Sequence, residues 1–163
     1  MTKRLGVGII GCGSISENHL KALIQTDNVY IAAVCDIDQV KRQRAAMQYG
    51  AVAYDDYHDL LADEHVHSVH VCTPHYLHAP MAIDALNSGH FVLTEKPMAI
   101  SRGQADAMLA AEAASGKMLG VCFQNRYNAA TRCIEQALHS GLGRVLGGAA
   151  IVMWDRGADY YAR

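Results

Sequence analysis

The sequence predicts an α/β fold: a doubly wound parallel sheet of the Rossmann type, followed by the truncated start of a second, α+β domain. Three observations lead to this prediction. Apolar segments of strand length alternate with helical segments along most of the chain, giving six strands and about five helices. The first strand runs into a glycine-rich turn, and the second ends on an acidic residue. Beyond Asn125 this alternation ends.

The N-terminal segment has the layout of a dinucleotide-binding βαβ unit. An apolar strand, a tight glycine turn, a helix and a second apolar strand follow one another, over Leu5–Ile10, Gly11–Ser16, Glu17–Thr26 and Val29–Cys35. Asp36 then ends the second strand. Glycines after strands often only make turns, so the prediction depends on the whole set being in register.

The residue types in this unit suit a pyrophosphate. Gly11 lets the chain turn sharply, and Gly13, which lacks a Cβ, lets the main chain approach a phosphate. The helix N-terminus directs N–H groups and a partial positive charge at that phosphate. Ser14 and Glu17 match an S-x-x-E capping box, which predicts the helix start independently of the glycines. A carboxylate at Asp36 can accept hydrogen bonds from the adenosine ribose.

Asp36 also predicts NAD as the cofactor, because its charge would repel a 2′-phosphate. Lys41 and Arg42 are close enough in sequence to soften that repulsion, so NADP stays an alternative. Ser16 departs from the usual pattern, since it stands where a glycine or alanine lets the helix press onto the strand. Its hydroxyl is expected to loosen this fit without abolishing it.

The later apolar segments predict four more strands, at 51–54, 67–73, 90–94 and 118–123. The helices between them are expected to begin at Asp38, at Asp55 or Asp56, near Pro80, and at a second capping box formed by Ser101 and Gln104. The expected strand order is 3-2-1-4-5-6, which places a cofactor across the carboxyl ends of strands 1 and 4.

The composition is that of a globular protein without a basic excess. Of 163 residues, 51% are hydrophobic and 18% charged, with a net charge of −2, so no nucleic-acid partner is expected. The N-terminus lacks the apolar core of a signal peptide and no apolar run is long enough for a membrane span, so no membrane partner is expected. The five cysteines lack CxxC spacing and are expected to be reduced, in a cytoplasmic protein.

The histidines around the fourth predicted strand are not expected to bind a metal. His65 and His67 share one face of that strand with Val69, whereas His70 lies on the other face. A metal site needs ligands that converge. These histidines are therefore interpreted as polar residues at a strand entrance, and no metal site is predicted.

A second group of polar residues lies at the carboxyl ends of strands 4 and 5, in Thr73-Pro74-His75, His78 and Glu95-Lys96-Pro97. With these residues, the sequence closely resembles the glucose-fructose oxidoreductase, inositol dehydrogenase and rhizopine-catabolism family (Gfo/Idh/MocA). The resemblance rests on motifs that cover nearly the whole chain in the right order: GIIGCGSIS, VCDID, CTPHYLH, LTEKPMA, FQNRYN and WDRGADYY.

The resemblance implies an enzyme: an NAD(P)-dependent oxidoreductase that transfers a hydride between nicotinamide and a hydroxyl or carbonyl carbon of a sugar, cyclitol or related polyol. By motif position, the implied cofactor-binding residues are Gly11, Gly13, Ser14, Ile15, Asp36, Thr73, Pro74, His78, Glu95, Lys96 and Arg126, the last towards the substrate. Lys96 is also the implied catalytic residue, because a hydride leaves a carbinol carbon more easily when a group takes the hydroxyl proton. In this family the Lys-Pro bond is often cis. An isolated Glu-Lys-Pro segment could instead be a surface lysine paired with its neighbouring glutamate.

Residues 1–123 are expected to form the NAD(P)-binding domain, and residues 124–163 the first helix and strand of a truncated substrate domain. In the family, the second domain supplies an Asp-x-x-x-His motif that completes the catalytic group, and no such pair follows Arg126 in this sequence. The chain alone is therefore expected to be incomplete as an enzyme. The alternative is a non-catalytic dinucleotide-binding or interaction module.

The C-terminal segment from Val145 to Trp154 predicts an apolar strand with no later strand to pair with. We expect it to pair with a second copy, to pack against the preceding helix or to be poorly ordered, and a homo-oligomer is expected. Trp154, Arg156, Tyr160 and Tyr161 indicate only a polar, hydroxyl-bearing ligand.

Overall fold

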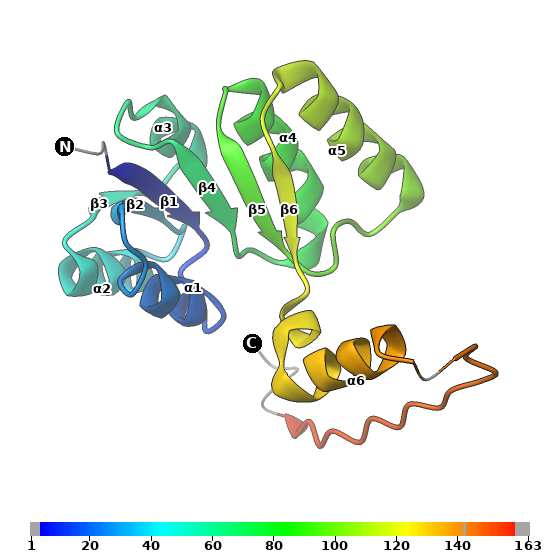
Figure 1. Cartoon of the computed structure of the whole chain (residues 1–163). Helices are drawn as coiled ribbons and strands as arrows, with labels where there is room; N and C mark the ends of the chain where they lie inside the picture. The colour runs from blue at the N-terminus through cyan, green and yellow to red at the C-terminus, as the bar shows by residue number, and fades with distance from the viewer. Residues whose placement is uncertain (1–3, 142, 159–163) are drawn as a thin grey trace. The chain divides into compact units, whose positions relative to one another are not determined.

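The computed structural model describes residues 4–141 and 143–158. The chain divides after Phe123 into two compact units, unit 1 (residues 1–123) and unit 2 (residues 124–163). Figure 1 colours the chain along its length and labels the helices and strands.

Unit 1 is built on a six-stranded parallel sheet, and its order, β3-β2-β1-β4-β5-β6, is the predicted one. The strands are β1 (Leu5–Ile10), β2 (Val29–Cys35), β3 (Val52–Tyr54), β4 (Ser68–Val71), β5 (Phe91–Glu95) and β6 (Leu119–Cys122). At the end of β1, Ile10 is aligned with Cys35 of β2 and with Val71 of β4. The residues that follow these strands therefore leave the sheet along one edge, called the carboxyl edge below.

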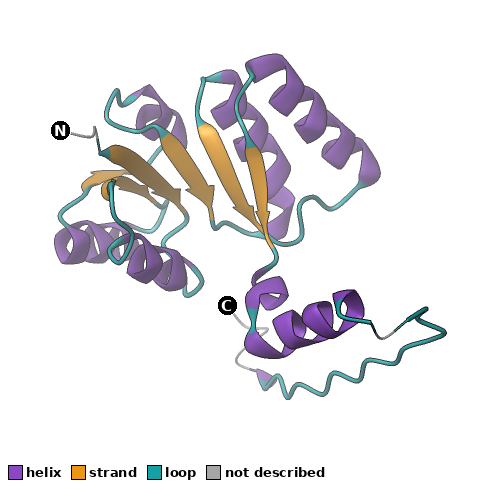
Figure 2. Ribbon diagram, in the orientation of Figure 1, coloured by secondary structure: helices purple, strands orange, loops and turns teal. Residues whose placement is uncertain are grey.

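Helices cover both faces of the sheet in unit 1 (Figures 1 and 2). They are α1 (Ser16–Leu23), α2 (Gln39–Tyr49), α3 (Tyr57–Ala62), α4 (His78–Asn87) and α5 (Arg102–Ser115), with a 3-10 turn (His75–Leu77) before α4. Helices α1 and α2 pack on one face, and α3, α4 and α5 pack on the other. This arrangement confirms the predicted doubly wound fold.

Each face of the sheet has its own apolar core. Ile9 of β1 packs with Leu20 of α1 on one face, and Val69 of β4 packs with Leu86 of α4 and Met108 of α5 on the other. All five side chains are fully buried. Burying a side chain of this size stabilises the fold by roughly 1.5–3 kcal/mol. The two cores thus fix the strand ends that form the carboxyl edge.

Three helices begin where the sequence predicts. The Asp38 carboxylate accepts hydrogen bonds from two N–H groups in the first turn of α2. The Asp56 carboxylate accepts one from the His58 N–H in α3, and the Ser101 hydroxyl oxygen accepts one from the Gln104 N–H in α5. These short polar side chains satisfy donors that have no partner within the helix.

The capping box predicted at Ser14 and Glu17 is wrong. Helix α1 begins at Ser16, its N-cap residue is Ile15, and no side chain caps its first turn. The Glu17 carboxylate instead accepts a hydrogen bond from the Tyr49 hydroxyl of α2 at 3.2 Å and pairs with an arginine of the same helix. Glu17 therefore connects two helices and does not close the start of its own.

Unit 2 contains a 3-10 turn (Gln124–Tyr127) and helix α6 (Ala129–His139). The Asn128 side chain caps α6 by accepting a hydrogen bond from the Thr131 N–H at 2.8 Å. Every residue of α6 is at least partly exposed within the described structure. The helix predicted after Asn125 is therefore formed, with its apolar side chains uncovered.

The strand predicted at Val145–Trp154 is not formed. Residues 143–157 contain neither helix nor strand, and Figure 2 draws them as loop. A strand is stabilised by hydrogen bonds to a neighbouring strand, and the described part of unit 2 offers none. Tyr160 and Tyr161, two of the residues that indicate a polar, hydroxyl-bearing ligand, lie outside the described residues.

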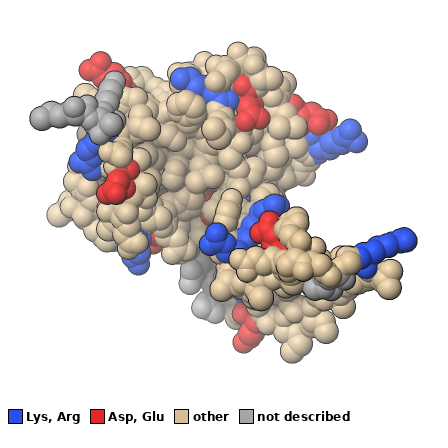
Figure 3. All heavy atoms as spheres, in the orientation of Figure 1, with Lys and Arg blue, Asp and Glu red and all other residues tan. Residues whose placement is uncertain are grey.

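Within the ranges that the structure describes, every helix is too short or too polar to cross a membrane. In the face shown in Figure 3, Lys and Arg side chains are interspersed with Asp and Glu side chains and separated by uncharged surface. This mixture agrees with the net charge of −2.

Candidate functional site

A cleft of about 840 Å³ opens along the carboxyl edge of unit 1. Its walls come from the loops that follow β1, β2, β3 and β4. Seven of the eleven residues predicted to bind a cofactor line it: Gly11, Gly13, Ser14, Ile15, Asp36, Thr73 and Pro74. The other four, His78, Glu95, Lys96 and Arg126, are not among its lining residues.

The two glycines of the turn after β1 have different roles. Gly11 has a φ of +94°, and a Cβ there would lie 2.8 Å from backbone atoms of Cys72. A side chain at Gly11 would therefore clash with the end of β4. A Cβ at Gly13 would meet no atom within 4 Å. The open space at Gly13 belongs to the cleft, and it leaves room for a group as large as a phosphate.

Ser16, which departs from the usual glycine pattern, is accommodated by a hydrogen bond. Its side chain is buried, and its hydroxyl donates to the carbonyl oxygen of Gly13 at 2.6 Å. Leu20, one turn later, is fully buried against the sheet. The serine therefore tightens the turn, and the packing of α1 on the sheet is kept.

The start of α1 offers an electrostatic environment that suits an anion. Ser14 and Ile15, which lead into the helix, line the cleft, and no side chain caps the first turn. The unpaired N–H groups and the helix dipole favour negative charge at this point. Burial, followed by the charge of Asp36, raises the pKa of the neighbouring Cys12 thiol to about 12, so this thiol stays uncharged.

The carboxylate of Asp36 is held in a fixed orientation at the end of β2. Its Oδ2 accepts a hydrogen bond from the Cys12 N–H at 2.7 Å, and its Oδ1 accepts one from the Asp38 N–H at 2.8 Å. Each oxygen can accept a further hydrogen bond. Asp36 therefore joins the glycine turn to the end of β2 and can still receive hydroxyl groups from the cleft.

The two basic residues near Asp36 are engaged elsewhere. The Arg42 guanidinium donates to the backbone carbonyl oxygen of Asp36 at 3.3 Å and not to its carboxylate. The Lys41 ammonium lies 3.5 Å from the Asp38 carboxylate. Lys41 nevertheless lines the cleft, so it is the closer of the two to any ligand there.

One wall of the cleft, residues 55–58 after β3, was not predicted from the sequence. Because β3 ends at the same edge as β2, the rule that singled out Asp36 would also have found this wall. The Tyr57 hydroxyl donates to the Asp84 carboxylate at 2.6 Å. Burial, followed by this hydrogen bond, raises the pKa of Tyr57 to about 12. Tyr57 is therefore a neutral ring, held in place on the β3 side of the cleft.

Thr73 lines the β4 end of the cleft with an unsatisfied polar atom. Among the described residues, its Oγ1 is the side-chain oxygen that is buried without a hydrogen-bond partner. Leaving such an atom unpaired costs roughly 1–3 kcal/mol.

His78 lies behind the cleft and joins two of its loops. Its ring is fully buried, with Nε2 2.8 Å from the carbonyl oxygen of Thr73 and Nδ1 2.7 Å from that of Pro97. Carbonyl oxygens only accept, so a neutral ring donates to one of them and a doubly protonated ring to both. The nitrogens of His78 therefore connect the loops after β4 and β5.

Glu95 ends β5 as a buried carboxylate. Its oxygens face His19 Nε2 at 3.0 Å and accept the backbone N–H of Lys96 at 3.2 Å. Burial tends to raise the pKa of Glu95, but the hydrogen bonds from His19 and from the Lys96 backbone outweigh it and hold the pKa below its ordinary value. Glu95 is therefore ionised, and its carboxylate is hydrogen-bonded to other groups of the protein.

Lys96 follows Glu95 as an exposed side chain at the carboxyl edge. Its backbone is fixed on one side by Glu95 and on the other by the Lys96-Pro97 peptide bond, which is cis, as the resemblance implies. The ion-pair partner of Glu95 is His19. A simple surface pair between Glu95 and Lys96 is thus not what the described structure contains.

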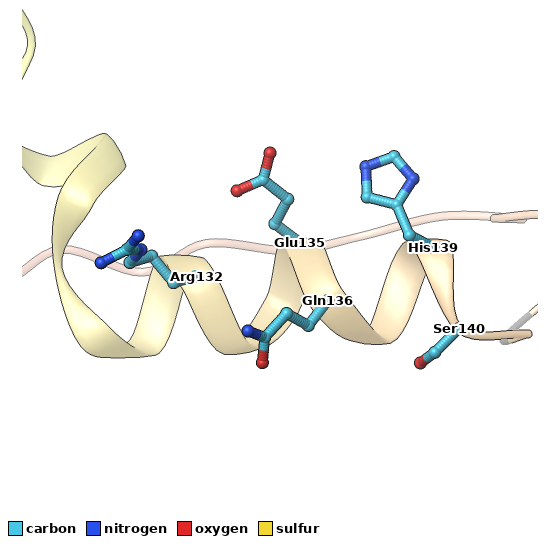
Figure 4. A pocket seen from close by; sticks show the side chains of 5 residues that line it. All are labelled: Arg132, Glu135, Gln136, His139 and Ser140. Atoms are coloured by element: carbon cyan, nitrogen blue, oxygen red, sulfur yellow. The ribbon is translucent and has the colours of Figure 1, made fainter.

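Arg126 belongs to unit 2, where it is exposed in the 3-10 turn before α6. A second hollow, of about 440 Å³, runs along α6 and is lined by Arg132, Glu135, Gln136, His139 and Ser140. These side chains come from one helix and the residue that ends it, Ser140, and Figure 4 shows Glu135 and His139 projecting to one side and Gln136 and Ser140 to the other. Groups that diverge in this way do not form a site for chemistry.

One set of side chains in the described ranges has the spacing of metal ligands: the ligand atoms of His19, Glu95 and Cys122 lie within 4.8 Å of one another. His19 and Glu95 are already hydrogen-bonded to each other. The structure does not test the expectation that the chain binds no metal, which stays a prediction.

The cleft fits a dinucleotide in three respects. The open space at Gly13, beside the uncapped start of α1, suits a diphosphate. The carboxylate of Asp36 has acceptor capacity left for ribose hydroxyls. Thr73 and Pro74 line the other end of the cleft, after β4.

Comparison with known proteins agrees with this geometry. Residues 5–123 match a family described as an oxidoreductase family with an NAD-binding Rossmann fold. The inositol 2-dehydrogenase of Salmonella paratyphi B is 36% identical over 141 residues, which are 84% of this chain and 42% of that protein. An inositol 2-dehydrogenase/D-chiro-inositol 3-dehydrogenase of Lactiplantibacillus plantarum is 41% identical over 126 residues, covering 74% of this chain and 36% of that protein.

A solved structure is similar over almost the whole chain. The WlbA dehydrogenase of Bordetella pertussis, in complex with NADH and UDP-GlcNAcA, superposes with a TM-score of 0.88 and 32% identity. The match covers 98% of this chain and 47% of that protein. The chain thus spans less than half the length of these relatives. With the family match over residues 5–123 and the motifs it contains, the chain belongs to the Gfo/Idh/MocA oxidoreductase family, with its NAD-binding Rossmann fold.

Proposed function

We propose that this chain binds NAD and forms the cofactor-binding part of an oxidoreductase that acts on a hydroxyl or carbonyl carbon of a sugar, cyclitol or related polyol. The observation that carries the proposal is the cleft at the carboxyl edge, which is lined by Gly13 with the open space beside it, by Asp36 and by Thr73. The relatives support it: two are named inositol dehydrogenases, and one was crystallised with NADH and a nucleotide sugar.

The cofactor would lie across the ends of β2, β1 and β4. Asp36 would hold the adenosine ribose, on the side where Tyr57 forms the wall. Gly11, Gly13, Ser14 and Ile15 would hold the diphosphate with backbone groups. Thr73 and Pro74 would contact the nicotinamide half. The charge of Asp36 favours NAD, and Lys41, which lines the same cleft, leaves NADP as the weaker alternative.

Bound nicotinamide would supply the hydride acceptor or donor. Lys96 would act on the substrate, taking the hydroxyl proton as the alcohol is oxidised and returning it in the reverse direction. Its exposure at the carboxyl edge suits contact with a substrate that enters from solvent. His78 and Glu95 would act indirectly, since both side chains are buried and hydrogen-bonded within the protein.

The remaining assignments are proposals of the same kind. Unit 1 would be the NAD(P)-binding domain and unit 2 the beginning of the substrate domain, with Arg126 towards the substrate; the division after Phe123 supports this. A cytoplasmic location is supported by the five cysteines, none of which forms a disulfide. A homo-oligomer stays a prediction.

Turnover can be tested by incubating the chain with NAD⁺ and a panel of polyols and following NADH absorbance. The change to compare is Lys96→Met, with Lys21→Met, an exposed lysine of α1, as the matched control. We expect only slow NADH formation by the native chain and the control, because the chain alone is expected to be incomplete as an enzyme, and a rate about 100-fold lower still in Lys96→Met. Saturable NADH binding with equal rates of NADH formation in the native chain and Lys96→Met would overturn the role of Lys96 and support a non-catalytic dinucleotide-binding module. No binding at all would contradict the proposal.

A further inference from the structure

A chain of buried and half-buried polar side chains connects α1 to the ends of β4 and β5. His19 of α1 places its Nε2 3.0 Å from Glu95 Oε1 and its Nδ1 3.0 Å from the Nδ1 of His70 on β4. His19 and Glu95 are 8% and 5% exposed. None of the three side chains lines the cleft, so they do not contact a ligand there directly.

The protonation states of this group are constrained by its contacts. Glu95 is ionised, so it accepts a proton-bearing Nε2–H from His19. Burial, followed by the charge of His19, lowers the pKa of His70 to about 4, so His70 is neutral. One proton then lies between the two Nδ1 atoms. The group forms a continuous hydrogen-bonded path from His70 through His19 to Glu95 and the backbone N–H of Lys96.

This path connects the two halves of the proposed cofactor site. At one end, α1 begins beside the space at Gly13 where the diphosphate would lie. At the other end, Glu95 fixes the backbone of Lys96. The following residue, Pro97, is joined through His78 to Thr73 on the cleft wall. A shift of His19 would therefore move the β5 end relative to α1.

A plain packing role would not need these residues. A buried carboxylate is costly unless several hydrogen bonds compensate it, and apolar side chains would fill the same space at lower cost. The hydrogen bond between His19 and Glu95 fixes the orientation of the two side chains as well as their distance, because hydrogen bonds are strongly directional. Such a bond suits a task in which the geometry of the β5 end matters.

We propose that His19 is a positioning residue: through Glu95 it holds the end of β5, and with it Lys96 and the nicotinamide side of the cleft, in register with the helix that receives the diphosphate. This inference rests on the proposed function, because it assigns His19 a role in the same cofactor site. It goes beyond that function in giving a task to residues that touch neither cofactor nor substrate.

The test compares His19→Leu with His19→Gln. A glutamine places an amide N–H close to the position of His19 Nε2 and can still donate to Glu95, whereas leucine cannot. NADH and ADP-ribose are titrated against each variant, since ADP-ribose keeps the adenosine and diphosphate but lacks the nicotinamide. For His19→Leu we expect NADH affinity to fall about tenfold, the equivalent of one charge-assisted hydrogen bond, with ADP-ribose affinity nearly unchanged. His19→Gln should retain most of the NADH affinity.

The controls separate positioning from general stability. His65→Gln changes an exposed histidine that is distant from His19 in sequence. It should change neither the NADH affinity nor the ADP-ribose affinity. If His19→Leu fails to fold, Glu95→Gln replaces it, because it keeps the side-chain shape and removes the charge. For Glu95→Gln, as for His19→Leu, NADH affinity should fall about tenfold while ADP-ribose affinity stays nearly unchanged.

Each other outcome overturns the inference. Equal losses for NADH and ADP-ribose would mean that His19 only supports α1, and unchanged NADH affinity in His19→Leu would mean that it positions nothing. Tight binding of one equivalent of Zn²⁺ to the native chain, lost in His19→Leu, would make His19 a metal ligand. If the native chain binds neither nucleotide, the proposed function fails as well. If it binds both and the variants do not separate them, only the inference fails.

Discussion

Gly13 differs from the glycines around it in the space that surrounds it. A Cβ at Gly6, Gly8 or Gly11 would press into neighbouring strands or side chains, so these glycines are needed for packing. A Cβ at Gly13 would touch nothing in the protein. The structure itself therefore gives no packing reason for a glycine at this position, and a ligand supplies one.

Replacing Gly13 with valine should separate binding from folding. The branched side chain would occupy the space where the diphosphate is proposed to lie, so NADH affinity should fall about 100-fold or more. The midpoint of thermal unfolding should change little, because the added atoms meet open space. The measurement is a fluorescence titration with NADH beside a thermal melt.

The matched control for this change is Gly103→Val in α5, where an added Cβ also meets no atom within 4 Å. It should leave NADH affinity unaltered. A Gly13→Val variant that binds NADH as tightly as the native chain would show that the turn does not hold a phosphate.

Asp36→Asn should shift the choice between NADH and NADPH. The asparagine keeps one acceptor oxygen, but its NH₂ group would face either the Cys12 N–H or the Asp38 N–H, so one of the two backbone hydrogen bonds is lost. The negative charge that disfavours a 2′-phosphate is also removed. We expect the ratio of NADPH to NADH affinity to rise by about tenfold.

The same titrations on Asp27→Asn provide the control, since this exposed residue before β2 changes the net charge equally. Its affinity ratio should be that of the native chain. An unchanged ratio in Asp36→Asn would remove the assignment of Asp36 to the ribose.

At the scale of elements, the ends of α1, β4 and β5 depend on groups that titrate. His70 has a pKa of about 4 in the folded chain, below its ordinary 6.5, because of burial and the neighbouring His19. Between these values the unfolded chain binds a proton that the folded chain does not, so the free energy of unfolding decreases as the pH falls from 6.5 towards 4. The pKa of the buried His90 is also lowered, which acts in the same direction.

This predicts acid destabilisation before the carboxylates are protonated. Between about pH 7 and about pH 5 the free energy of unfolding should fall by roughly 2 kcal/mol on account of His70. Urea unfolding at the two pH values measures it. His70→Gln should show a smaller decrease, from His90 and other groups alone. An equal decrease in both proteins would contradict the role given to His70.

The elements themselves could be predicted from the sequence better than their connections. The apolar segments and short polar caps gave β1, β2 and the helix starts at Asp38 and Ser101, because these depend on neighbours in sequence. The capping box at Ser14 was wrong, since Glu17 is taken by Tyr49 from another helix. Such a competition between distant partners is not visible in local spacing.

The same holds for the site: features set by neighbours in sequence could be predicted, and contacts between distant elements could not. The positions of the glycine turn and of Asp36 at the carboxyl edge follow from strand order. The path from His70 through His19 to Glu95 was missed, because its members lie on three elements and the motif that contains Glu95 does not indicate its partner His19. One signal existed: alternation along β4 places His70 on the face opposite Val69, the face that α1 covers.

At the scale of the whole molecule, the chain combines a complete sheet with a second unit whose apolar side chains are exposed. Ile134 and Leu138 of α6 and Leu146, Ile151 and Met153 beyond it are all open to solvent in the described structure. In these relatives, the part that lies outside the match is longer than the matched part. The cofactor cleft lies in unit 1 and does not depend on unit 2 for any of its lining residues.

All of these proposals depend on a dinucleotide that binds across the carboxyl edge of unit 1, with its diphosphate at the glycine turn. The most direct measurement is a side-by-side fluorescence titration of the chain with NADH and NADPH. The account predicts saturable NADH binding, with NADPH weaker by about tenfold because of the charge at Asp36. Absence of saturable binding for either nucleotide would contradict it.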